Sequence, residues 1–357
     1  MSNRIRLLAS ASGAGFLLFQ AAPALAAGTA SGTTISNTAS VNYTVGGVAQ
    51  TAVNSNAATF VVDRRVNLTV AEVGNATTSV APGSTAQVLS FTVTNTSNAA
   101  LDLGLTVTQQ AGGTAAHGGT DNFDVTAPSL FRDTNGNGSY DAGTDTAVTF
   151  LDEVAADQTV TVFIVSNIPA GQANGDVAGL TLTATAREAG AAGTQGAVVA
   201  QTAGANTAGV DTVFADGAGI LDAARDGQSS DNDDYTVAAP VLTVTKQSRV
   251  ISDPLNGTTD PKLIPGAVVE YCIIVANGSG AAQANAVTIT DPIPANTTYD
   301  SGYGIFVNGT YTGTVPAGTC NLDGTAGGSF ASNTVTGPLG SLNAGTTRTL
   351  YFRVTVN

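Results

Sequence analysis

Residues 88–96 read VLSFTVTNT, where Leu89, Phe91 and Val93 alternate with serine and threonine. This period of two is typical of a β-strand that packs one face against a core and leaves the other face polar. Similar segments occur at TVTVFIV (159–165), LTLTATA (180–186) and LYFRVTV (350–356). Because turn sequences rich in glycine and asparagine separate them, the sequence predicts an all-β fold built from β-sandwiches.

The composition of the 357-residue chain supports this prediction. It includes 42 glycines, one methionine and no tryptophan, while threonine, valine, alanine and asparagine are frequent. Many strand formers separated by turn formers argue against long helices. The length is sufficient for two or three domains, each with its own core.

The first 26 residues predict an export signal peptide. Arg4 and Arg6 precede an apolar run from Leu7 to Phe19, and Ala24-Leu25-Ala26 matches a cleavage site. No later segment has the roughly 18 unbroken apolar residues of a membrane-spanning helix. We therefore expect a secreted or cell-surface protein without a transmembrane segment.

The charge of the chain argues against nucleic acid as a partner. The predicted signal peptide holds two of the 12 basic residues and none of the 26 acidic ones. The mature chain would thus carry 10 basic and 26 acidic side chains, a net charge of −16. Binding to phosphate backbones requires a basic surface, which this sequence does not provide.

Two cysteines, Cys272 and Cys320, occur in the last third of the chain. In an exported protein such thiols normally pair, and we predict a disulfide between them. It would close a loop of about 49 residues, for which the chain-entropy model gives roughly 4 kcal/mol of stabilisation. A reactive thiol is the alternative.

A weak internal repeat predicts two related domains. Residues 80–107 and 263–294 both run strand, Pro-Gly turn, strand, polar turn and strand. We expect an N-terminal β segment over 27–65 with a hairpin at Gly46-Gly47, a first sandwich over 66–239, and a second sandwich over 240–357. Whether the N-terminal segment belongs to the first sandwich stays open.

The second sandwich resembles a known family. Its segments PGAVVEYCIIVANGSGAAQANAVTITDPIPANTTY (265–299) and GPLGSLNAGTTRTLYFRVTV (337–356) are similar to the immunoglobulin-like conserved repeat domain of bacterial and archaeal surface proteins. The resemblance covers residues 240–357 well and residues 66–190 more loosely. It implies a secreted or surface-attached, non-catalytic sandwich in tandem copies, and it offers no catalytic residues.

The segment DTNGNGSYDAGTD (133–145) places an oxygen-bearing side chain at every second position and Gly138 at a sharp bend. This matches positions 1 to 9 of an EF-hand-type calcium loop, whereas position 12 holds Thr144 with Asp145 one residue later. We predict a calcium site formed by Asp133, Asn135, Asn137, Ser139, Asp141 and Asp145. Flanking strands predict a stiffened loop and no conformational switch; a bare turn is the alternative.

A second acidic segment spans residues 211–235. Asp216, Asp222 and Asp226 are candidates for another cation site, but their spacing fits no standard loop. We therefore interpret the segment as a solvated acidic linker.

The residue inventory argues against an enzyme. His117 is the sole histidine, and both cysteines are assigned to a disulfide, so the usual pairs of base and nucleophile are missing. Carbohydrate hydrolysis by two carboxylates is the remaining option, but a chain without tryptophan has few of the aromatic platforms that such clefts use.

Three hypotheses for the function follow. The first is an exported, non-catalytic structural or interaction protein of the bacterial cell surface, a calcium-stabilised spacer that contacts other surface proteins. The second is a subunit that assembles with copies of itself into a filament or surface layer by adding an edge strand to a neighbour. The third is an adhesin or carbohydrate-binding module in which exposed Tyr299, Tyr303 and Tyr311 stack on a glycan.

Overall fold

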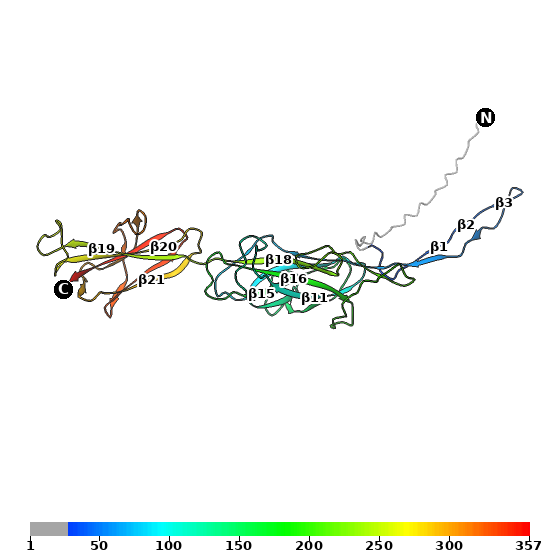
Figure 1. Cartoon of the computed structure of the whole chain (residues 1–357), viewed down its shortest axis with the longest axis horizontal. Helices are drawn as coiled ribbons and strands as arrows, with labels where there is room; N and C mark the ends of the chain where they lie inside the picture. The colour runs from blue at the N-terminus through cyan, green and yellow to red at the C-terminus, as the bar shows by residue number, and fades with distance from the viewer. Residues whose placement is uncertain (1–27) are drawn as a thin grey trace, which may run out of the picture.

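The computed structural model describes residues 28–357, so the predicted signal peptide lies outside the described residues. Within this range the chain forms 29 strands and no helix, which confirms the all-β prediction. A long two-stranded ribbon and two β-sandwiches follow one another along an extended molecule (Figure 1).

The first sandwich consists of two five-stranded sheets, ordered β13-β12-β15-β10-β8 and β14-β11-β16-β18-β9. Their strands are β8 (Leu68–Glu72), β9 (Thr78–Val80), β10 (Gln87–Asn95), β11 (Leu101–Gln109), β12 (Thr126–Arg132), β13 (Thr146–Ala147), β14 (Phe150–Val154), β15 (Thr159–Asn167), β16 (Val177–Glu188) and β18 (Gln228–Val237). The alternating pattern of β10 predicted one buried face, and Leu89, Phe91 and Val93 are indeed buried between the sheets.

The second sandwich begins after a short crossing between Val237 and Leu242. One sheet has the order β19-β20-β29-β23-β26, with β22 also paired to β29, and the facing sheet has the order β21-β28-β27. The strands are β19 (Leu242–Ser252), β20 (Val268–Asn277), β21 (Ala284–Pro292), β22 (Thr297–Tyr299), β23 (Ile305–Gly309), β26 (Thr325–Ala326), β27 (Ser329–Ala331), β28 (Thr334–Leu342) and β29 (Thr347–Val356). Its core is separate from that of the first sandwich.

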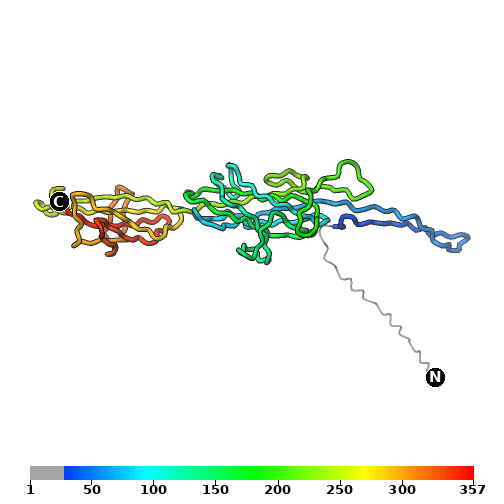
Figure 2. Tube along the Cα trace, turned by 90° about the horizontal axis from the view of Figure 1, so that it is seen from below, coloured from blue at the N-terminus to red at the C-terminus, as the bar shows by residue number. Residues whose placement is uncertain are grey.

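The N-terminal segment forms one antiparallel ribbon, which we call the arm (residues 34–61). Three strand pairs build it: β1 (Thr34–Asn37) with β6 (Ala58–Val61), β2 (Ser40–Val41) with β5 (Val53–Asn54), and β3 (Thr44–Val45) with β4 (Val48–Ala49). Gly46 and Gly47 form the turn with φ of 57° and 81°, which glycine adopts without a steric penalty. The arm projects from the end of the first sandwich that is remote from the second (Figures 1 and 2).

The interpretation of residues 211–235 as a solvated linker is wrong. β17 (Thr212–Phe214) pairs in parallel with β7 (Arg64–Val66), and β18 lies inside a sheet between β16 and β9. Asp233 and Asp234 are buried. Backbone N–H groups donate to these carboxylates, that of Asp234 to Asp233 and that of His117 to Asp234, which lowers the cost of burying them. Composition alone does not reveal such partners.

Candidate interaction and metal sites

The arm exposes large apolar side chains along its whole length. They are between 37 and 65 % exposed: Ile35, Val41, Tyr43, Val45, Val48, Val53 and Phe60. Several of them are direct cross-strand partners, because Ile35 lies opposite Phe60, and Val41 lies opposite Val53. Partners in such pairs project on the same side of a ribbon. The arm therefore presents apolar cross-strand pairs to solvent at more than one position along its length.

The arm is also uncharged. Residues 27–62 contain no Asp, Glu, Lys, Arg or His, and the first ionisable side chain after them is Asp63. Charged residues on exposed strands normally prevent association between sheets. Such protection is absent from the sequence of the arm.

A second exposed strand lies in the other half of the chain. β19 is an edge strand that pairs only through β20, on one side. Apolar side chains are exposed at its start, where Val241, just before the strand, and Leu242 and Val244 within it are 46, 44 and 67 % exposed. Farther along, Lys246 forms an ion pair with Asp291, so the apolar part of this edge is confined to the start of the strand.

The loop predicted to bind calcium connects β12 to β13, two paired strands. Both Asp133 oxygens are engaged, because the backbone N–H groups of Gly136 and Gly138 donate to them at 2.7 and 2.8 Å. Ser139 donates its N–H to Asn137 Oδ1. Asp145 is buried and accepts hydrogen bonds from the N–H groups of Thr134 and Asp141. The loop is thus curled by its own side chains, with Asp145 at its base.

The side chains at the centre of this loop converge on Asp141. The Nδ2 atoms of Asn135 and Asn137 lie 2.8 and 2.6 Å from Asp141 Oδ2. These bonds, that from Asn135 first, lower the pKa of Asp141. Two amides and a carboxylate therefore meet at one point on the surface.

Asp216, Asp222 and Asp226 do not assemble into a cation site. Each accepts hydrogen bonds from backbone N–H groups: Asp216 from Asp226 and Gly227 across the segment, Asp222 from Gly219, and Asp226 from Ala223. Within residues 28–357, the group of three or more ionisable ligands that could share an ion does not include them. Their role is to hold the turns that lead into β18.

The expectation that three tyrosines are exposed is wrong, since all are half-buried. Tyr299 stacks on Phe330 with ring centroids 4.3 Å apart. The Tyr303 hydroxyl donates to Glu270 Oε2 at 3.2 Å, and burial, with Glu270 second, raises the pKa of Tyr303 to about 12. Tyr311 accepts a hydrogen bond from Gln247 at 3.1 Å. These rings support the sandwich itself.

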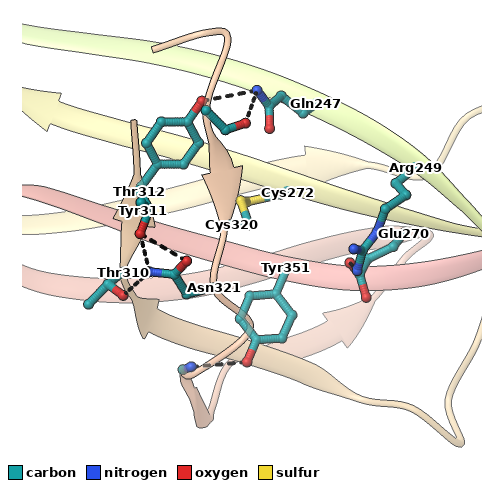
Figure 3. The surroundings of a disulfide bond; sticks show 12 residues. Gln247, Arg249, Glu270, Cys272, Thr310, Tyr311, Thr312, Cys320, Asn321 and Tyr351 are labelled. Atoms are coloured by element: carbon teal, nitrogen blue, oxygen red, sulfur yellow. Dashed lines mark hydrogen bonds and ion pairs between the residues drawn. A yellow bond between two sulfur atoms is a disulfide. The ribbon is translucent and has the colours of Figure 1, made fainter. Parts of the chain in front are cut away.

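The expected disulfide between Cys272 and Cys320 is present, with Cα atoms 6.6 Å apart. It ties β20 to the small hairpin of β24 (Tyr311–Thr312) and β25 (Thr319–Cys320), as Figure 3 shows. Asn321, which follows this bond, donates to the hydroxyls of Thr310 and Thr312. The disulfide thereby fixes a segment that has few strand partners of its own.

Sequence patterns did not reveal a cluster formed by Glu72, His117 and Asp233. His117 Nε2 lies 3.4 Å from Asp233 Oδ1 and 3.8 Å from Glu72 Oε1. Glu72 ends β8, Asp233 belongs to β18 in the other sheet, and His117 lies in the loop after β11. Three segments distant in sequence supply the groups, so no local motif exists. The one signal in the sequence was that His117 is the sole histidine of the chain.

Comparisons with known proteins give structural likeness only. A scan against models of protein families finds no match, and a search of curated proteins also finds none. Among solved structures, the C-terminal domain of the AgI/II polypeptide BspA of Streptococcus agalactiae is 9 % identical over 82 % of this chain and 91 % of that chain, with a TM-score of 0.35. The CupB6 tip adhesin of Pseudomonas aeruginosa is 14 % identical over 82 and 87 %, with a TM-score of 0.26.

A third similar structure is a putative membrane anchored protein from Corynebacterium diphtheriae. It is 11 % identical, with 91 % of this chain and 89 % of that chain covered and a TM-score of 0.21. Scores this low carry no function over to the present chain. Among the described residues, no helix has the length and apolar character needed to cross a membrane.

Proposed function

We propose that this chain is an exported, non-catalytic structural protein of the cell surface that binds a second copy of itself through the arm. The observation that carries the proposal is the exposure of seven large apolar side chains on an isolated two-stranded ribbon. An isolated hairpin is only marginally stable in water, and large exposed apolar patches mark interaction sites. Burial of the arm against a partner would relieve both problems.

The distribution of charge supports a second copy as that partner. With a net charge of −16 for the predicted mature chain, two copies repel each other over most of their surface. The arm carries no charge between residues 27 and 62. It can therefore approach an acidic neighbour without like-charge repulsion.

The proposed acceptor is the start of β19 on the second copy. This edge has unpaired backbone groups and exposed Val241, Leu242 and Val244, so an arm strand can add to it through backbone hydrogen bonds and apolar contacts. Donor and acceptor are different surfaces at different places along the molecule (Figure 1). Such a head-to-tail contact leaves both surfaces free for further copies, and it extends into a linear assembly.

Substitution of the Val41–Val53 pair in the arm should weaken this association. We expect the variant Val41→Ser/Val53→Ser to self-associate about 100-fold more weakly, because burial of each valine contributes about 1.5 kcal/mol. Sedimentation velocity over a range of concentrations, on the chain from Ala27, measures the change. The variant Thr44→Ser/Ala49→Ser alters the neighbouring cross-strand pair without removing large apolar groups, and it should associate as the wild type does.

We further propose that the loop at residues 133–145 binds calcium and stiffens the β12–β13 hairpin. The supporting observation is the convergence of Asn135, Asn137 and Asp141 on one surface point. Amide and carboxylate oxygens are the ligands that calcium prefers. To contact an ion at that point, each amide would have to rotate and exchange the hydrogen bond that its oxygen now accepts, from the N–H of Asn137 or of Ser139, for a bond to calcium. With few carboxylates, affinity should fall in the range of about 10⁻⁴ to 10⁻³ M that extracellular modules show.

Calcium at 10 mM should raise the melting temperature of the first sandwich by about 3–8 °C, given this affinity. Asp133→Ala/Asp141→Ala should lose the rise, while Asp124→Ala, which removes a carboxylate outside the loop, should keep it. Differential scanning calorimetry measures both, with magnesium as the control ion. An equal calcium effect in the double variant would refute the site.

A further inference from the structure

We propose that Glu72, His117 and Asp233 form a binding site for a divalent transition-metal ion of the zinc type. The cluster contains the sole histidine of the chain and two carboxylates, and their ligand atoms all lie within 4.8 Å of one another. It is separate from the loop at residues 133–145 and from the arm. This proposal is therefore independent of the proposed function.

The spacing of the ligand atoms fits a tetrahedral ion. Zinc binds imidazole nitrogen and carboxylate oxygen at about 2.0–2.2 Å, so two ligand atoms of a tetrahedral site lie about 3.3–3.6 Å apart. His117 Nε2 is 3.4 Å from Asp233 Oδ1 and 3.8 Å from Glu72 Oε1. The histidine–carboxylate separations therefore match or nearly match those of a tetrahedral site, and all three ligand atoms lie within 4.8 Å of one another.

Hydrogen bonding within the protein does not account for the position of the imidazole. His117 Nε2 is buried and has no hydrogen-bond partner, although two carboxylate oxygens face it. Those oxygens are already engaged, because Asn75 N–H donates to Glu72 Oε1 and Asp234 N–H donates to Asp233 Oδ1. A metal ion between the three groups would use lone pairs that these bonds leave available.

The electrostatics of the cluster also favour a bound cation. The side chains of Glu72 and Asp233 are only 9 and 3 % exposed. A divalent ion would neutralise the two carboxylates and offset the cost of burying them.

The type of ligand selects the metal. One imidazole and two carboxylates suit zinc and related transition metals, whereas calcium and magnesium prefer oxygen alone. Three protein ligands leave a fourth position for water in a tetrahedral site.

The ion would connect parts of the fold that share few covalent constraints. Glu72 comes from one sheet of the sandwich, Asp233 from the other, and His117 from a loop. The backbone N–H of His117 also donates to Asp234 Oδ2 at 2.7 Å. Zinc should therefore stabilise the first sandwich by joining both sheets and this loop.

Isothermal titration with zinc chloride, on the metal-stripped chain from Ala27 without a histidine tag, tests the site. We expect one ion per chain and a melting temperature about 5–10 °C higher at a zinc concentration 100-fold above Kd. His117→Asn should weaken zinc binding by more than about 100-fold, because loss of an outer-shell partner alone costs about 10–100-fold. Cobalt(II) should give the intense visible absorption of a tetrahedral site with a nitrogen ligand.

Two further variants separate binding from folding. Asp233→Asn keeps an oxygen for the Asp234 N–H but removes the buried charge, so it should melt higher than the wild type without metal and gain nothing from zinc. Asp133→Ala/Asp141→Ala should bind zinc as the wild type does. The absence of saturable zinc binding, or equal binding by the folded His117→Asn variant, would overturn the proposal.

Discussion

Replacement of both cysteines, as Cys272→Ala/Cys320→Ala, should lower the free energy of unfolding of the second sandwich by about 4 kcal/mol. The bond spans a sequence separation of 48 residues, and its loss lets the unfolded chain explore many more conformations. The hairpin of β24 and β25 has only two residues in each strand, so this segment should loosen first.

Urea denaturation and calorimetry would each measure this loss of stability. The transition of the first sandwich, which has its own core, should keep its midpoint in the same sample. Reduction of the wild type should reproduce the result of the substitution. A double variant as stable as the oxidised wild type would show that the bond does not constrain the unfolded chain.

The second large effect concerns β10, the strand whose alternating sequence predicts the β-sandwich fold. Phe91→Ala should destabilise the first sandwich by about 3–5 kcal/mol, because Phe91 is fully buried and its removal leaves a cavity between the sheets. Thr92→Ala, on the opposite face of the same strand, should cost no more than about 1 kcal/mol. Calorimetry on the two variants compares the faces directly, and equal losses would contradict the observed register.

Much of the fold could be predicted because strands with one buried face carry their pattern locally. β10 is such a strand, and its alternation agrees with its burial. β18 could not be predicted in this way, because its sequence QSSDNDDYTV is polar and its burial depends on partners far along the chain. The Asp231 carboxylate, for example, accepts a hydrogen bond from the N–H of Glu72 in the facing sheet.

The candidate sites also differ in whether a local sequence pattern reveals them. The loop at residues 133–145 and the cysteine pair are visible in sequence because spacing or residue type marks them. The hairpin at Gly46-Gly47 is visible as well, but its isolation from both sandwiches is a property of the whole fold. The cluster of Glu72, His117 and Asp233 depends on three segments that meet only after folding, so no sequence window contains it.

For three tyrosines, the sequence wrongly predicted exposure where the fold buries the side chains in part. Tyr299, Tyr303 and Tyr311 occur in a polar, glycine-rich segment, which suggested exposure. In the fold they pack on neighbouring rings or hydrogen-bond to polar side chains that come from other strands. Local polarity is therefore a weak indicator of the exposure of an aromatic ring.

The most direct test of the central claim is a cross-linking experiment between two variants that each add one free cysteine. Val45→Cys places a thiol near the tip of the arm, and Val244→Cys places one on the exposed start of β19; the native cysteines are already paired. With a short thiol-specific cross-linker, a mixture of the two variants should give a covalent dimer, and neither variant alone should do so. Efficient cross-linking of Val45→Cys to itself, or none in the mixture, would contradict assembly of the arm onto β19.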